Sequence, residues 1–139
     1  MIFQYTLIES SGNNKPILTV GLFSKDGKEG ISTSLIVDSG ADMTLIDSRL
    51  ASLLGIDLLK CTKGKTVWGF GSKKNNIITY QAEIKIEFTD GKNKSRRILS
   101  DVAFIDIEDG YGVLGQKGFF EYHKISFDRK KNKFYIDEE

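Results

Sequence analysis

Short runs of hydrophobic residues make up most of this 139-residue chain, and clusters of Gly, Asn, Asp and Lys separate them. Runs of this length, bounded by turn-forming residues, predict β-strands. Ile84, Ile86 and Phe88 alternate with charged residues, so their strand should have one buried and one solvated face. The pattern predicts strands over Phe3–Glu9, Ile17–Ser24, Ile31–Val37, Thr66–Phe70, Ile77–Phe88, Arg96–Asp106, Ile125–Asp128 and Phe134–Ile136.

Two segments depart from the strand pattern and predict short helices. Asp47–Gly55 begins with a capping residue, carries apolar residues at helical spacing and ends in glycine. Gln116–His123 is long enough for about two turns. Polar segments at Lys25–Lys28, Thr89–Lys92 and Arg129–Asn132 predict hairpin turns. The chain is therefore expected to form a mostly antiparallel β domain with two short helices, closed or nearly closed into a barrel.

The composition narrows the classes of function. A length of 139 residues corresponds to one domain, expected to span residues 1–139. The 20 Lys and Arg residues and 19 Asp and Glu residues give a net charge of +1, which predicts no general attraction to nucleic acid or to an anionic membrane. No apolar stretch approaches the roughly 20 residues that span a bilayer, and the N-terminus lacks a secretory signal pattern. A soluble, cytoplasmic protein is expected.

The single cysteine and the single histidine limit the available chemistry. Cys61 excludes an intrachain disulfide framework, and we expect it to pack as a small hydrophobic side chain. His123 excludes a multi-histidine metal site, and its place at the end of the second expected helix favours a capping or packing role. The acidic residues between 101 and 109 are spaced too loosely for a calcium loop. No metal or cofactor is expected.

One hydrophobic strand runs directly into an acidic residue. Leu35–Val37 is followed by Asp38, Ser39, Gly40 and Ala41. A carboxylate at the end of a buried strand is costly unless hydrogen bonds or a partner compensate for its burial. Glycine lets the backbone turn tightly, and the serine hydroxyl can bond to a neighbouring loop. The tetrapeptide alone is equally typical of an ordinary turn after a core strand.

The downstream sequence strengthens a functional interpretation. A glycine-rich segment, Val67–Gly71, is followed much later by the apolar pair Val113 and Leu114, by Gly115, and by the second expected helix. In this order the motifs resemble those of the retropepsin-like aspartic proteases, and the resemblance covers most of the chain. It implies a retropepsin-like closed β-barrel, the acid protease fold, with one lobe per chain. It also implies an aspartic endopeptidase, a hydrolase that acts on an extended peptide or protein substrate.

The resemblance implies a role for each matching residue. Asp38 would be the catalytic carboxylate, and Ser39 would join the two catalytic loops of a dimer through its hydroxyl. Gly40 would accept substrate on its carbonyl, beside Ala41, and Asp42 would bind substrate amides. The flap that closes over the peptide would include Trp68, Gly69, Phe70 and Gly71. The segment that packs behind the catalytic loop would be Val113, Leu114 and Gly115.

Only one Asp-Ser/Thr-Gly triplet is present, although the chemistry needs two carboxylates around one water. The Asp-Gly pairs that begin at positions 26, 90 and 109 lack the hydroxyl residue and are typical of turns. The second aspartate is therefore expected to be Asp38 of another copy, in a homodimer with two-fold symmetry. Two alternatives remain open. The first is an inactive dimer of the same fold that binds a peptide or a protein partner, and the second is a small-ligand-binding barrel in which Asp38 is structural.

Two positions depart from the pattern of the family. Ser39 stands where threonine is commoner, so the hydroxyl is kept and the methyl group is lost. Gln116 stands where many viral relatives have an arginine that pairs with the acid equivalent to Asp42, so a neutral hydrogen bond is expected in place of that ion pair. Terminal strands from Met1–Glu9 and Phe134–Asp137 could form a sheet between subunits, and the sequence leaves this question open.

Overall fold

The computed structural model describes residues 1–68 and 75–137, with only the backbone described at positions 67, 68 and 75. Its strands are β1 (Ile2–Gln4), β2 (Thr6–Ile8), β3 (Asn13–Lys15), β4 (Ile17–Phe23), β5 (Gly30–Val37), β6 (Leu45–Asp47), β7 (Thr62–Trp68), β8 (Asn75–Phe88), β9 (Ile98–Ile105), β10 (Val113–Leu114), β11 (Ile125–Asp128) and β12 (Lys133–Ile136). Three short 3-10 helices follow β6, namely η1 (Ser48–Leu50), η2 (Ser52–Leu54) and η3 (Leu58–Lys60). In the described part of the chain, no helix has the length and apolar character that a membrane span requires.

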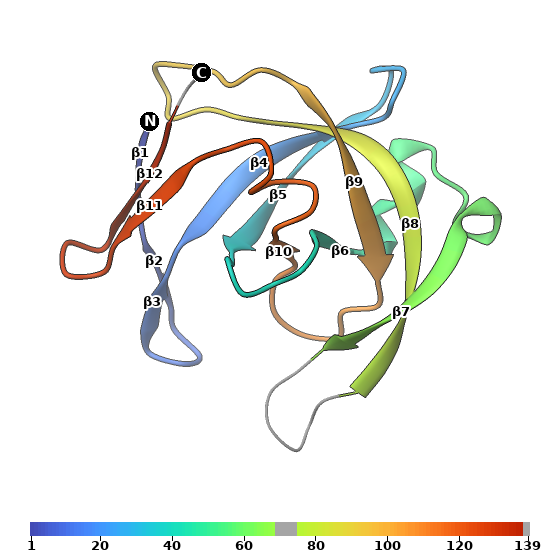
Figure 1. Ribbon diagram of the computed structural model, residues 1–139, viewed down its shortest axis with the longest axis horizontal. Helices are drawn as coiled ribbons and strands as arrows, with labels where there is room; N and C mark the ends of the chain where they lie inside the picture. The colour runs from blue at the N-terminus through green and yellow to red at the C-terminus, as the bar shows by residue number, and fades with distance from the viewer. Residues whose placement is uncertain (69–74, 138–139) are drawn as a thin grey trace.

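The largest sheet closes on itself (Figure 1). Its strand order is β4-β5-β10-β6-β9-β8-β7, and β8 also pairs with β4. The 14-residue strand β8 makes this closure possible because its successive parts meet different partners. Its C-terminal part pairs with β4, its middle pairs with β9, and its N-terminal part pairs with β7. The mostly β architecture expected from the sequence is confirmed.

A hydrophobic core fills the ring of strands. Ile84, Ile86 and Phe88 on β8 are at most 4% exposed, which confirms the buried face predicted from their alternation. A second, smaller cluster lies at the end of the ring near β6 and β10. Its buried members are Leu45, Ala103, Ile105, Ile107 and Val113, and Ile36, Ala41 and Met43 pack against them. This second cluster forms the apolar floor beneath the site described below.

The two ends of the chain meet in a separate three-stranded sheet of order β1-β12-β11, called here the terminal sheet. The N-terminal ammonium of Met1 donates to the Ile136 carbonyl at 2.7 Å, and the rings of Phe3 and Phe134 stack at 5.2 Å. The terminal strands thus pair within one chain. No described strand pairs with the outer edge of β11, which stays available to a further strand.

Both predicted helices differ from what the structure contains. Asp47–Gly55 folds into η1 and η2, which begin where the Asp47 carboxylate accepts from the Arg49 N–H and end at Gly55, with φ of 69°. The prediction of a helix over Gln116–His123 is wrong, because this segment forms turns. Lys117 pairs with Met43 as an isolated β-bridge, and the adjacent Gly118 has φ of 94°, so the backbone leaves the helical region.

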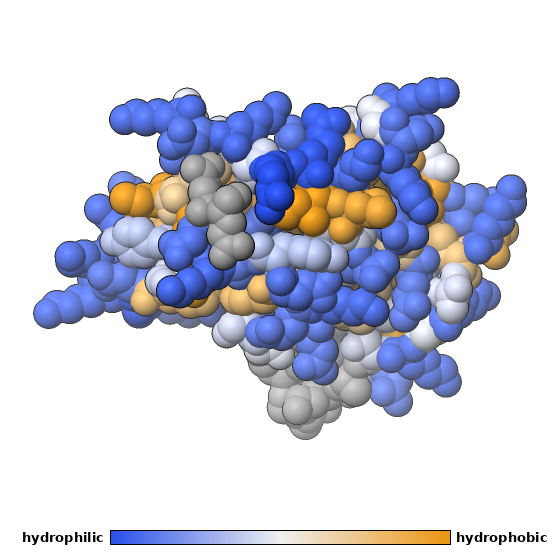
Figure 2. All heavy atoms as spheres, turned by 45° about the horizontal axis from the view of Figure 1, so that its top comes forward, coloured by the Kyte–Doolittle hydropathy of each residue, from blue (hydrophilic) through white to orange (hydrophobic). Residues whose placement is uncertain are grey.

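Several large hydrophobic side chains remain at the surface. The most exposed are Leu59 at 84%, Ile2 at 59% and Leu7 at 56%. Figure 2 shows one face on which a band of hydrophobic residues lies between charged and polar ones. Single exposed apolar residues are ordinary in soluble domains. Hydrophobic residues gathered on one face offer a surface on which another molecule could bury apolar area.

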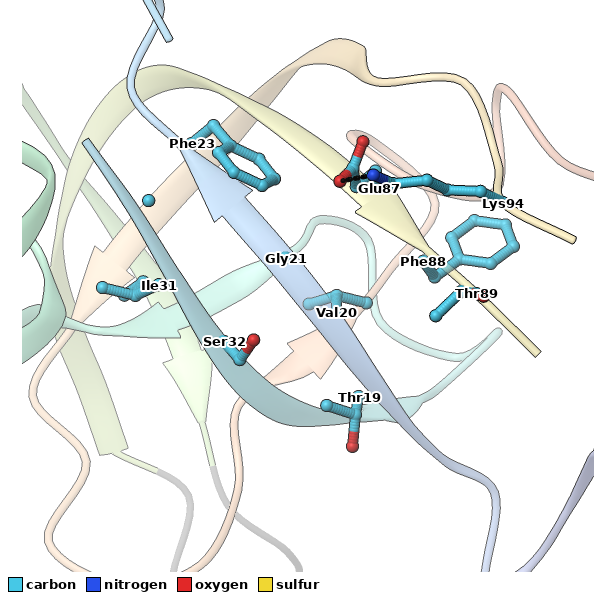
Figure 3. Close-up of a pocket in the computed structure, with 11 residues that line it drawn as sticks. Thr19, Val20, Gly21, Phe23, Ile31, Ser32, Glu87, Phe88, Thr89 and Lys94 are labelled. Atoms are coloured by element: carbon cyan, nitrogen blue, oxygen red, sulfur yellow. Dashed lines mark ion pairs between the residues drawn. The ribbon is translucent and has the colours of Figure 1, made fainter. Parts of the chain in front are cut away.

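A stacked cluster holds the outer faces of β4, β5 and β8 together and lines a shallow cavity of about 490 Å³ (Figure 3). The Phe23 ring occupies the space above Gly21 and Gly30, where an added Cβ would lie 2.8 and 2.7 Å from ring atoms. The Arg97 guanidinium lies over the same ring at 3.5 Å. Arg97 also pairs with Glu87 at 3.2 Å. The two glycines thus give the ring a place to lie, and the ring positions the ion pair.

Glu87 makes this cluster sensitive to pH. Its side chain is only 12% exposed and pairs with both Lys94 and Arg97. Burial opposes ionisation of Glu87, but the bonds from Arg97 and Lys94 outweigh it, so the pKa is lowered from 4.5. A lowered carboxyl pKa stabilises the folded state above the pKa of the unfolded chain, and the contribution is lost as the pH falls through the folded value.

We predict that Glu87→Gln lowers the free energy of unfolding by about 1 kcal/mol at pH 7. The difference from wild type should shrink towards zero as the pH falls below 4.5, because Glu87 becomes protonated in both states. Urea denaturation at a series of pH values measures both quantities. Glu83→Gln on the same strand is the control, since its pair with Lys25 is exposed on both sides, at 46% and 65%. An equal effect of both substitutions would contradict the prediction.

Candidate active site

The Asp38 loop is a tight turn held by backbone hydrogen bonds on both sides of β5. The Asp38 N–H donates to the Leu114 carbonyl at 3.0 Å, and the preceding Val37 N–H donates to the Pro16 carbonyl at 2.8 Å. The carboxylate of Asp38 accepts from the Gly40 N–H at 2.9 Å, and the Ala41 N–H donates to the Asp38 carbonyl at 3.1 Å. This turn fixes the side chain at the mouth of the ring, partly exposed to solvent.

Backbone packs directly against backbone behind the Asp38 loop. Strand β10 runs parallel to β5 on one side and antiparallel to β6 on the other. An added Cβ on Gly115 would lie 2.4 Å from the Met43 carbonyl oxygen and 2.8 Å from that of Ala41. One on Gly112 would lie 2.3 Å from the Leu45 carbonyl oxygen. No side chain fits at either position, so both residues are required to be glycine.

Thr44 ties together this contact of residues 112–115 with residues 41–45, called here the crossing, and no motif singled Thr44 out. It is fully buried in an otherwise apolar run, and its hydroxyl accepts from the Gly115 N–H at 3.1 Å. Its backbone N–H donates to the Lys117 carbonyl, and its carbonyl accepts from the Ala103 N–H at 3.0 Å. Thr44 therefore joins the Asp38 loop, β9 and the Gly115 segment. The one available signal was a hydroxyl residue inside a hydrophobic run.

Gln116 also fixes the Asp38 loop, through one side-chain and one backbone hydrogen bond to carbonyls of that loop. Its side-chain amide donates to the Ser39 carbonyl at 2.7 Å, and its backbone N–H donates to the Ala41 carbonyl at 2.9 Å. The expected neutral hydrogen bond is present, but its partner is the Ser39 carbonyl rather than the Asp42 side chain. The physical reason is that the turns after Gly115 bring Gln116 against the backbone of the loop. The adjacent Lys117 N–H reaches the Asp42 carbonyl at 3.0 Å.

A cavity of about 720 Å³ opens beside Asp38. Its described lining includes the sequence-predicted residues Asp38, Gly40, Ala41, Asp42 and Val113. Apolar side chains of the second cluster form much of the remainder. Lys15, Asp109 and Tyr111 also line it, and they were not assigned to the site from the sequence, because none of the matching motifs includes them.

The other predicted site residues lie outside this cavity or outside the described residues. Leu114 is fully buried behind the loop, and Ser39 is exposed on its outer side. The backbone of Trp68 ends strand β7, paired with Asn75 on β8. The remaining flap positions, Gly69, Phe70 and Gly71, lie outside the described residues. Thr66 on β7 lines the Asp38 cavity, so the β7–β8 hairpin extends towards the site.

His123 and Cys61, which the sequence also singled out, make packing contacts away from the Asp38 cavity. The His123 ring packs against the rings of Phe88 and Phe119, at 5.1 and 4.8 Å between centroids. Cys61 is partly buried, and its thiol lies 3.5 Å from the Asp57 carbonyl. Burial, with the nearby Asp57 charge, raises the pKa of the Cys61 thiol above 9.0. A raised pKa disfavours the thiolate, so Cys61 is not activated as a nucleophile.

Comparison with solved structures identifies the fold. The chain is similar to a retropepsin-like aspartic protease from Rickettsia conorii, with a TM-score of 0.62 and 16% identity over 99% of this chain and 89% of the other. It is also similar to EIAV protease complexed with the inhibitor HBY-793, with a TM-score of 0.47 and 20% identity over 73% of this chain and 82% of the other. No protein-family model and no curated protein sequence matches the chain. The chain has a mostly β, retropepsin-like fold.

We predict that Gly115→Ala destabilises the protein by about 3 kcal/mol, because the methyl group meets backbone carbonyls that no side-chain rotation can move. Gly12→Ala is the control. Gly12 has φ of 70° and nothing within 4 Å of an added Cβ, so the cost there is the backbone conformation alone, about 1 kcal/mol. Denaturant unfolding compares the two. Equal losses of stability would show that the crossing accommodates the methyl group.

Proposed function

We propose that this protein is an aspartic endopeptidase, active as a homodimer. The two Asp38 side chains, one from each copy, together bind and activate a single water. The observation that carries the proposal is the position of Asp38. A carboxylate oriented by the Gly40 N–H stands at an apolar-lined cavity of about 720 Å³, in a retropepsin-like fold. The ionised aspartate would take a proton from the water, and the protonated one would polarise the scissile carbonyl.

The need for two copies follows from the chemistry. Two carboxylates about 3 Å apart cannot easily both ionise, so they share one proton and divide the roles of acid and base. Each chain supplies one Asp-Ser-Gly triplet and one lobe. A two-fold axis beside the Asp38 loops would bring the second carboxylate to the first. Ser39, exposed on the outer side of the loop, is then suited to bond across that axis, and Asp42 and the flap residues would bind the peptide.

The described strands favour one way of building the interface. Because β1 and β12 pair within the chain, a sheet shared between subunits would add strands at an open edge of the terminal sheet rather than exchange chain ends. The edge strand β11 carries Phe127, which is 40% exposed beside the buried Phe134. A second copy of β11 placed antiparallel to the first would bond to the unpaired backbone groups of this edge and cover the Phe127 ring.

We predict that Asp38→Asn lowers peptide cleavage by about a thousandfold or more, while the fold and peptide binding persist. A diverse peptide library, assayed between about pH 4 and pH 7, measures cleavage over the range in which a carboxylate pair titrates. Asp57→Asn is the matched control, since Asp57 also accepts from the N–H two residues ahead, that of Leu59, at 3.0 Å. It should leave cleavage unchanged.

Two results would count against the proposal. Cleavage that survives Asp38→Asn would remove the aspartate from the chemistry. A confirmed dimer that binds peptides without cleaving any of them would establish the inactive peptide-binding module in place of the enzyme. Protein melting curves for each variant separate loss of chemistry from loss of fold.

A subunit-mixing experiment tests the shared site. When equal amounts of wild type and Asp38→Asn are mixed and allowed to exchange, random pairing leaves about half of the wild-type chains in all-wild-type dimers. The activity per wild-type chain should therefore fall to about half, and a tenfold excess of the variant should nearly abolish it. An equal mass of an unrelated protein is the control. Activity that is insensitive to the variant would indicate that a single chain is sufficient.

A further inference from the structure

Lys15 is held close to the catalytic strand by a contact that the sequence motif does not include. It ends β3, the second strand of a two-stranded hairpin with β2 that forms a sheet of its own (Figure 1). The next residue, Pro16, accepts from the Val37 N–H at 2.8 Å, and Val37 directly precedes Asp38. The base of the hairpin is thereby fixed against the end of β5. Lys15 and Asp38 line the same cavity.

The charges around this cavity are unevenly placed. Among the described residues that line it, Lys15 is the only basic one, and the acidic ones are Asp38, Asp42 and Asp109. Lys15 lies on the β4 side of β5. Asp109 belongs to the segment leading into β10, on the other side, where the Ile36 N–H donates to the Gly112 carbonyl at 3.0 Å. The positive charge is thus confined to one flank of the cavity.

Lys15 is exposed, and within residues 1–68 and 75–137 it forms no ion pair. A lysine ammonium on a four-carbon stem can follow a ligand carboxylate and bond to it with charge assistance. Apolar side chains such as Ile36, Met43 and Leu45 form part of the same lining. A peptide lying over this floor would exclude water from part of the pair and strengthen it.

We propose that Lys15 is a specificity-determining residue that selects substrates with an Asp or Glu side chain at one fixed position on each side of the scissile bond. The proposal rests on the proposed peptidase function. Because Asp109 lies on the opposite flank, the preference is for an acidic residue at a position and not for acidic peptides in general. In a two-fold dimer both copies present Lys15, so the preference appears at two positions placed symmetrically about the scissile bond.

The test compares cleavage-site profiles of the dimeric protein on a diverse peptide library. Wild type should enrich Asp and Glu at the symmetric positions. Lys15→Gln should lose this enrichment, with kcat/KM for an acidic peptide relative to its amide counterpart falling roughly tenfold. Lys15→Glu should reverse the preference towards Lys and Arg at the same positions. The control is Lys130→Glu, which makes the same charge change in the exposed turn between β11 and β12 and should leave the profile unchanged.

The outcomes separate this inference from the function on which it rests. If wild type cleaves peptides and Lys15→Glu gives the same profile, the specificity role is overturned while the peptidase stands. If wild type cleaves nothing, both are overturned. If Lys130→Glu changes the cleavage profile in the same way as Lys15→Glu, the effect comes from net charge alone, and the proposal is also overturned. Melting temperatures of the variants show that each comparison is made between folded proteins.

Discussion

The site depends on one close passage of backbone past backbone. Strand β10 lies between β5 and β6, and Gly112 and Gly115 lie against the backbone of residues 41–45 with no room for a side chain at either position. The same segment fixes the Asp38 loop from behind, through the bond from the Asp38 N–H to the Leu114 carbonyl and the bond from the Gln116 N–H to the Ala41 carbonyl. The crossing is possible only with glycine at its points of contact. The position of the carboxylate is therefore set by residues about 75 positions further along the chain.

The sequence predicted well what depends on local pattern. The alternation along β8 identified its buried face, and the bounds of β11 agree with the prediction, because both follow from neighbouring residues. The segment Gln116–His123 was expected to be helical because its pattern alone is compatible with a helix. A tertiary constraint decides otherwise, since Lys117 pairs with Met43 as a β-bridge and Gly118 has a positive φ, both incompatible with a helix there. The single strand expected over Phe3–Glu9 divides for a tertiary reason too, because β1 pairs with β12 while β2 pairs with β3.

The candidate site was predictable where the motifs of the resemblance mark it. The resemblance carried by the Asp38 motif and by Gly115 placed both in a single loop region. Thr44 and Lys15 were missed, because no local pattern distinguishes a buried threonine that bonds to a distant N–H, or a strand-end lysine beside a cavity. Gln116 was recognised as a departure from the family, but its partner was not. A neutral amide that bonds to a backbone carbonyl does not depend on the charge of Asp42, so the loop is held whatever that side chain binds.

The division between inward-facing and outward-facing groups suggests how folding and activity are related. Within the described residues every buried side-chain nitrogen and oxygen has a hydrogen-bond partner, and the core is closed around β8. Asp38 is only partly buried, so its charge costs the single chain little. In the proposed dimer a second copy would cover the site and raise that cost, and the sharing of one proton between the two carboxylates would offset it. On the proposed function, folding would be complete within one chain whereas catalysis would need association of two, so the activity would depend on the concentration of the protein.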